Sequence, residues 1–297
     1  MAADKASLAA STQEANPIHR AATQVKQPTT GTSHSFGNGF AKFAALGGPL
    51  SILFFFIMLP MTDFLPPKPP RMPTEKVVAH YVYHEKSLKG GVALMTFVGL
   101  FFPLYTAAIG GQLSRIPGMP KTVIYTQLIG GTLGGLFLTL PAYFFAVTMY
   151  RLDRPPEITQ ALHDQAWIFF AMPFPSLLAQ DLSFSYGVLL DRRQNPLFPH
   201  WLAYFSSGMT LTFWPALGTH CVKHGAVAWN GGLTFWTAGV GGGLQILVMS
   251  IYTWFAASRK DLPADGEATE RTITQDVEVN RFALAARREA RSCPPEI

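Results

Sequence analysis

Six apolar segments in the middle of the chain constrain its fold more than any other feature. Each is close to the roughly 20 residues that a helix needs to cross a hydrocarbon core of about 30 Å. Lys, Arg and Glu are absent from the segment interiors, and a single Asp interrupts them. Because backbone groups in lipid must be hydrogen-bonded within their own segment, we predict an all-α integral membrane protein with a bundle of six transmembrane helices. The predicted spans are residues 43–61, 91–112, 122–150, 166–190, 201–222 and 231–257.

Composition supports this class and excludes others. Charged residues make up 14% of the chain, against about 25% in an ordinary soluble domain. The net charge of +5 comes from basic residues scattered in ones and twos, so we expect no nucleic-acid partner. The two cysteines, Cys221 and Cys293, are too few for the disulfide framework of a small secreted protein.

Polar tails are predicted before and after the membrane domain in the sequence. Residues 1–42 contain no apolar run and no signal peptide, so we expect a disordered tail before the six-helix domain at 43–257. Residues 258–297 form a second polar tail. Six spans place both termini on one face of the bilayer. Lys and Arg near the span ends divide evenly between the faces, and we expect cytoplasmic termini because polar tails without a signal are left untranslocated.

The first loop predicts a second kind of helix. Residues 62–73 hold five prolines and form a stiff extended segment. The following stretch, 74–90, has its apolar and polar residues on opposite helical stripes, which predicts an amphipathic helix lying at the membrane interface between spans one and two. The apolar stripe is Val77, Val78, Tyr81 and Val82, and the polar stripe is Lys76, His80, His84 and Ser87.

Small residues and prolines predict how the spans pack. Glycines spaced four apart in the third span permit close approach of a helix, from the same chain or from a partner subunit. Prolines in four spans predict kinks that can open internal cavities. The glycines are Gly130, Gly131, Gly134 and Gly135, and the prolines are Pro103, Pro141, Pro173, Pro175 and Pro215.

Asp181 is the one formal charge inside a predicted span. A carboxylate there is energetically costly, so it is protonated, paired or turned to a polar cavity. It is therefore a candidate proton-transfer group or ligand anchor. The structural alternative is a hydrogen bond to a neighbouring span, at Gln127, Thr210 or Gln245.

Two histidine pairs predict a metal site. His80 with His84, and His220 with His224, are spaced to share one face of a helix, which can chelate a transition metal such as non-haem iron, zinc or copper. With six spans, both pairs face the same side of the membrane. The alternative is that these histidines are interfacial and solvated.

The third loop adds acid–base groups on that same side. Glu157, His163 and Asp164 lie where Pro155 and Pro156 can begin a short helix. Together with Asp181 they are our candidates for catalytic general acid–base work.

Three stretches resemble a family of uncharacterised multi-pass bacterial membrane proteins. They are RLDRPPEITQALHDQAW, containing RxxRPPE and LxDxxW, then FPHW, an FPxW motif, and AWNG. The resemblance spans residues 43–257 and implies a six-span helical bundle. It implies no particular activity.

Three functions compete. The first is a membrane enzyme, or an auxiliary subunit of one, that acts on a lipophilic small molecule such as a lipid, terpenoid or hydrocarbon. The second is a proton-coupled transporter or permease that uses Asp181. The third is a non-catalytic scaffold that binds a partner membrane subunit or its own copies through glycine faces. The sequence contains no Walker motif and no GxGxxG after a strand, so we expect no nucleotide-driven chemistry.

Overall fold

The computed structural model describes residues 33–260, and every regular element in that range is helical. The predicted tails at 1–32 and 261–297 lie outside the described residues. Residues 33–42 belong to helix α2 (Ser33–Ala45), so the predicted irregular tail is wrong at its last residues. The helical run that starts there continues into α3 (Gly47–Met61).

Four helical stretches are long and apolar enough to cross a membrane. They overlap the predicted first, second, third and sixth spans, and the third is a single helix of 30 residues. The second stretch begins at Glu85, so the helix predicted for 74–90 ends early, at Tyr83. At 1.5 Å per residue that helix is about 45 Å long, so it extends past a hydrocarbon core of about 30 Å. The stretches are Gly39–Met61, Glu85–Ser114, Lys121–Tyr150 and Gly232–Ser258. Their elements are α3, α5 (Glu85–Thr96) with α6 (Val98–Ser114), α7 (Lys121–Tyr150), and the π-helix η2 (Gly232–Thr237) with α11 (Ala238–Ser258).

The predicted fourth and fifth spans are each divided by proline. The fourth consists of α8 (Pro156–Ala171) and α9 (Pro175–Leu190), separated at Pro173. The fifth is α10 (Trp201–Leu211) followed by the 3₁₀ helix η1 (Trp214–Cys221), which has Pro215 in its first turn. Proline removes a backbone donor and clashes with the preceding turn, and for this reason neither segment is one continuous α-helix.

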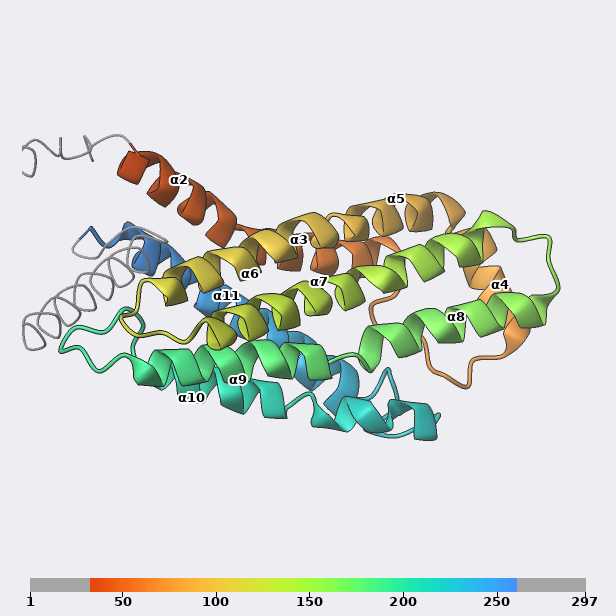
Figure 1. Ribbon diagram of the computed structural model, residues 1–297. Helices are drawn as coiled ribbons and strands as arrows, with labels where there is room; N and C mark the ends of the chain where they lie inside the picture. The colour runs from red at the N-terminus through yellow and green to blue at the C-terminus, as the bar shows by residue number, and fades with distance from the viewer. Residues whose placement is uncertain (1–32, 261–297) are drawn as a thin grey trace, which may run out of the picture. The chain divides into compact units, whose positions relative to one another are not determined.

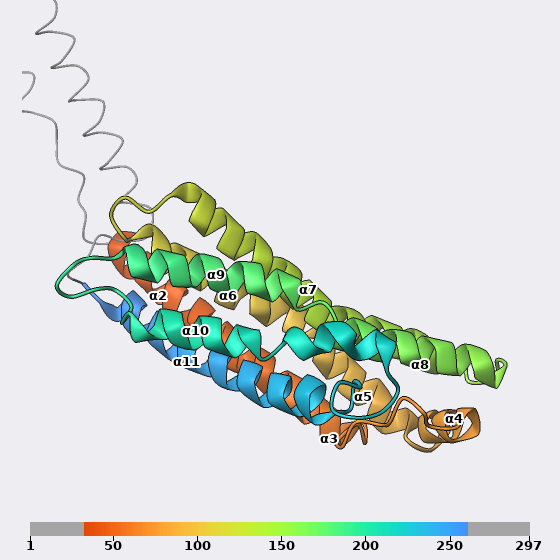
Figure 2. The same cartoon turned by 90° about the horizontal axis from the view of Figure 1, so that it is seen from below.

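The helices of residues 37–260 run roughly along a common direction (Figures 1 and 2). α7 contacts α6 on one side and the consecutive helices α8 and α9 on the other. Helix α4 (Thr74–Tyr83) packs on α8 near the connection between α7 and α8. Helices α10 and α11 lie side by side, and α11 also contacts α3.

Two apolar cores fill this bundle. One is formed around Phe64, Tyr81 and Trp167, where α4, α5, α7 and α8 meet. The other is formed around Phe102 and Phe184, where α6, α9, α10 and α11 meet. Phe55 of α3 packs against both cores, so the space between them is lined by several helices at once.

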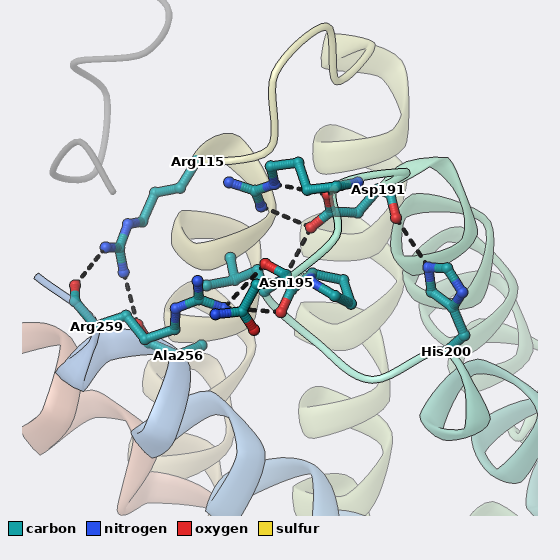
Figure 3. A network of polar contacts seen from close by, with 9 residues as sticks. Arg115, Asp191, Asn195, His200, Ala256 and Arg259 are labelled. Atoms are coloured by element: carbon teal, nitrogen blue, oxygen red, sulfur yellow. Dashed lines mark hydrogen bonds and ion pairs between the residues drawn. The ribbon is translucent and has the colours of Figure 1, made fainter. Parts of the chain in front are cut away.

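A polar network joins the ends of α6, α9 and α11 (Figure 3). The Arg115 side chain is buried and donates hydrogen bonds to the carbonyls of Ala256 and Arg259, both at 2.7 Å. Asp191, also buried, binds Arg193 at 2.6 and 2.7 Å, and its carbonyl lies 2.8 Å from His200 Nε2. Arg115 and Asp191 are thus both hydrogen-bonded within the chain.

Candidate functional site

The loop after α3 and helix α4 bring one carboxylate and two imidazoles together. Asp63 Oδ2 lies 3.6 Å from His80 Nδ1 and 3.5 Å from His84 Nε2. The two imidazole rings are 4.9 Å apart at their centroids, and one ligand atom from each of the three residues lies within 4.8 Å of the others. Among residues 33–260, this is the group of side chains whose spacing suits a metal ion.

Local backbone structure explains why Asp63 is there. The Thr62 hydroxyl donates to the Met58 carbonyl at 2.8 Å, and the Phe64 N–H donates to the Leu59 carbonyl at 2.8 Å. Between these bonds Asp63 takes a left-handed conformation with φ 54°, which Asp tolerates better than most side chains. The chain therefore reverses immediately after α3 and carries Asp63 toward α4.

The buried face of α4 differs from the one predicted. His80 is buried together with Val77 and Tyr81, whereas Val82 is 56% exposed. The assignment of His80 to a polar, solvent-facing stripe is therefore wrong. The reason is tertiary: the His80 ring stacks on Phe64 at 5.1 Å, so this part of the helix faces the core around Phe64.

His163 lies in the same core, on α8. Its Nδ1 is 2.8 Å from the Tyr81 hydroxyl, and its ring centroid is 6.2 Å from those of Phe64 and Trp167. Among the described residues, nothing hydrogen-bonds to the buried Nε2 atoms of His163 and His80 or to Trp167 Nε1. Two imidazoles thus keep unused polar atoms in an aromatic environment.

Burial and charge set the ionisation of this region. Burial lowers the pKa of His80 to about 4, with the positive charges of Lys68 and His84 acting in the same direction. Burial also lowers the pKa of His163 to about 3, with a smaller contribution from His80. The hydrogen bond from Lys68 lowers the pKa of Asp63. At neutral pH the two buried imidazoles are uncharged and Asp63 is ionised.

We expect the melting temperature in detergent to fall as the pH is lowered from 6.5 toward 4, and part of this fall to come from His163. An unfolded histidine takes up a proton near pH 6.5, whereas folded His163 does so only near pH 3. Between those values the unfolded state binds more protons. The free energy of unfolding therefore decreases by up to about 1.4 kcal/mol per pH unit as the pH falls.

The matched variant is His163→Gln, which stays neutral and still offers an acceptor to Tyr81. Its melting temperature should depend less steeply on pH over the same range, leaving the contribution of His80. Equal slopes for the two proteins would contradict the assignment of His163 as buried and neutral.

The predicted acid–base residues do not form one cluster. Glu157 is exposed in the first turn of α8. Asp164 is half-buried, and burial raises its pKa against the opposing charge of Lys223. Asp181 lies on α9, the helix that follows α8 in the same row. At 1.5 Å per residue, it is separated from His163 by roughly 25 Å along the helix direction.

His220 and His224 are not joined to the first histidine pair. His220 is exposed and its Nδ1 contacts the Leu217 carbonyl at 2.9 Å. The 3₁₀ helix ends at Cys221 and Val222 is extended, so His224 does not share a helical face with His220. The four-histidine site expected from i, i+4 spacing is not assembled, because the helix ends between the members of the second pair.

Asp181 forms the second polar site, on α9. It is buried, and the Thr210 hydroxyl donates to its Oδ2 at 2.5 Å, so the predicted bond to Thr210 is confirmed. The side chains of Gln245 and Ser206 also lie within hydrogen-bonding reach of the carboxyl group. α9, α10 and α11 thus meet at this residue through neutral hydrogen-bonding groups.

A cavity of about 230 Å³ lies beside Asp181 and between the two apolar cores. Most of its lining is aliphatic and aromatic, from α3, α6, α7, α9 and α11. Trp236 and Val240 line it and are also 44% and 62% exposed, so they mark its opening on an apolar surface. Its polar lining residues are Ser51, Tyr105, Gln180, Asp181, Thr234 and Gln245.

Sequence reasoning missed Asp63 and Lys68 as members of the histidine site. Both lie in the proline-rich first loop, and Lys68 Nζ binds Asp63 Oδ2 at 2.7 Å. The available pattern was an acidic residue just after a span, in the same loop as two paired histidines. The proline-rich segment separates Asp63 from His80 in the sequence, so no local spacing connects them.

Comparison with protein-family models, curated proteins and solved structures finds no match to this chain.

Proposed function

We propose that the protein is a membrane enzyme, or an auxiliary subunit of one, that takes a lipophilic small molecule into the cavity beside Asp181. The observation that carries this proposal is the cavity itself, an apolar and aromatic space with a few convergent polar groups. Ligand sites in proteins have this composition, with polar groups that fix orientation. The exposed apolar residues at its opening, Trp236 and Val240, fit entry from the lipid phase.

We further propose that α8–α9 and α10–η1 enter the bilayer, which gives six spans. Large apolar side chains on these elements face outward, among them Leu182, Tyr186 and Leu211. Helix α4, with its exposed Val82 and Lys76, would lie at headgroup level. With six spans, residues 33 and 260 share one face, which we place in the cytoplasm.

Asp181 would be the ligand-facing carboxylate. It lines the cavity and is bonded to a hydroxyl group from α10. A carboxyl group bonded to neutral partners in an apolar space can exchange a proton with a ligand. His163 and Asp164 do not line this cavity, and the His163 ring lies 6.2 Å from that of Phe64, the residue after Asp63.

A proton-coupled transporter is the second candidate, favoured by the same buried carboxylate. The scaffold alternative has less support, because the glycines of α7 are already occupied within the chain. A Cβ at Gly130 or Gly131 would meet atoms of α9 or α6 within 3.0 Å. These faces are not free for a partner helix.

The test is binding of 1-aminoanthracene, a small lipophilic fluorophore, to the protein in nanodiscs, followed by energy transfer from tryptophan. Gly239 lines the cavity, and a Cβ there meets no atom within 4 Å. Gly239→Leu adds a large side chain to the lining, from a Cβ position without contacts, and should weaken probe binding at least tenfold. Gly208→Leu is the matched control, because Gly208 is exposed, lies outside the lining and also has room for a Cβ.

Equal probe affinity in wild type and Gly239→Leu would reject the cavity as the ligand site. If binding is lost as expected, lipid extracts of cells expressing wild type or Asp181→Asn separate the two candidates. A new lipophilic product that depends on Asp181 supports the enzyme. Uptake of a lipophile into proteoliposomes that loses its pH dependence in Asp181→Asn supports the transporter.

A further inference from the structure

We propose that Asp63, His80 and His84 bind a divalent transition-metal ion, in exchange for the ammonium group of Lys68. The inference is independent of the ligand cavity, since no residue of this group lines it. Two imidazoles and one carboxylate are the ligand types that zinc and non-haem Fe(II) share. Three protein ligands would leave at least one coordination position open for water or a substrate.

The distances fit a small ion with little movement. Ligand atoms around tetrahedral zinc lie about 2.0–2.2 Å from the metal, which places them about 3.3 Å from one another. The carboxylate oxygen of Asp63 already lies 3.5 and 3.6 Å from nitrogens of His84 and His80. A hydrogen-bonded network without a metal would favour shorter contacts, of about 2.7–3.2 Å.

The ligand atom of His80 in the proposed site is Nδ1, which lies 3.6 Å from Asp63 Oδ2. The side chain is 6% exposed, so burial holds the ring in place. Its Nε2, on the other side of the ring, has no hydrogen-bond partner among the described residues and takes no part in the site. His84 is 27% exposed and Asp63 45%, so an ion can reach the group from solvent.

Lys68 supplies the positive charge in the present structure. Its Nζ contacts the same Asp63 Oδ2 that faces both histidines. A lysine side chain can move its head group to water while its stem stays packed. The backbone at Lys68 is held separately, because Trp229 Nε1 donates to its carbonyl at 2.8 Å. Removing the ammonium group therefore frees the carboxylate without releasing the loop.

The experiment measures zinc bound to the full chain, purified in detergent without chelators. Protein is incubated with Zn(II), passed through gel filtration and analysed by inductively coupled plasma mass spectrometry. Wild type should retain about one equivalent, and His84→Ala and Asp63→Asn should lose at least 90% of it. The control is the double variant His220→Ala/His224→Ala, which should bind zinc as wild type does. The visible absorption spectrum of protein loaded with Co(II) in place of Zn(II) then reports whether nitrogen and oxygen atoms ligate the metal.

The direction in which zinc affinity changes in Lys68→Gln distinguishes a metal site from a structural ion pair. A metal site should bind zinc about tenfold more tightly in this variant, because a competing charge is removed. A purely structural ion-pair network should instead lose stability and gain no metal affinity. The proposal is overturned if folded wild type and Lys68→Gln both fail to retain zinc, or if His84→Ala retains as much as wild type.

Discussion

Gly130→Ala should destabilise the bundle by about 1–3 kcal/mol or prevent its folding. A Cβ at this position would lie 2.7 Å from the Gln180 backbone nitrogen and 2.8 Å from the Ser176 carbonyl oxygen. Both contacts are to the backbone of α9, which cannot rotate away as a side chain can. Over-packing of an interior costs about this much when the backbone must shift. Thermal melting in detergent and the yield of monomer on gel filtration measure the effect.

The matched control is Gly208→Ala in α10, where a Cβ meets no atom within 4 Å. Its melting temperature should stay close to that of wild type, because substitutions without new contacts change stability by about 0.5 kcal/mol or less. If Gly130→Ala melts like Gly208→Ala, α7 and α9 are not in close contact at this position. The glycine face of α7 would then be free to bind a partner helix, as the scaffold hypothesis requires.

Hydropathy predicts the four long helices, and it does not show where prolines divide the fourth and fifth predicted spans into shorter helices. The stretches that contain α3, α5–α6, α7 and α11 are apolar and 23 to 30 residues long, and their length distinguishes them. The fourth and fifth segments are also apolar, but they are divided at Pro173 and near Pro215. Composition cannot say whether a proline kinks a span or ends a helix, since neighbouring helices decide that.

The sequence predicted two parts of the candidate site and missed the rest. Spacing brought His80 and His84 together, and cost of burial singled out Asp181 with Thr210 as a partner. The role of Asp63 depends on a chain reversal after α3, which no local pattern specifies. The pairing of His220 with His224 failed for the opposite reason, because it assumed a helix that ends at Cys221.

Arg115→Met should lower stability by about 1–3 kcal/mol and loosen the end of α11. Arg115 is 1% exposed, and it donates to the carbonyls of Ala256 and Arg259 in the last turn of α11 and just after it (Figure 3). The Ala256 carbonyl also accepts from the Arg259 N–H at 3.2 Å, so the Arg259 carbonyl depends more on Arg115, and a cation at a helix C-terminus is favourable. Each buried acceptor left unsatisfied costs about 1–3 kcal/mol.

Hydrogen exchange separates this local effect from a general loss of stability. In Arg115→Met, amides in the last turn of α11 should exchange faster than those near Asp181, which keep their own partners. Arg192→Met is the matched control, because Arg192 belongs to the same end of the bundle but is exposed, and it should change neither measurement. Uniformly faster exchange throughout the chain would mean that Arg115 supports the whole bundle and not the end of one helix. Unchanged exchange would mean that water replaces the guanidinium, so that this end of the bundle is wetter than its burial indicates.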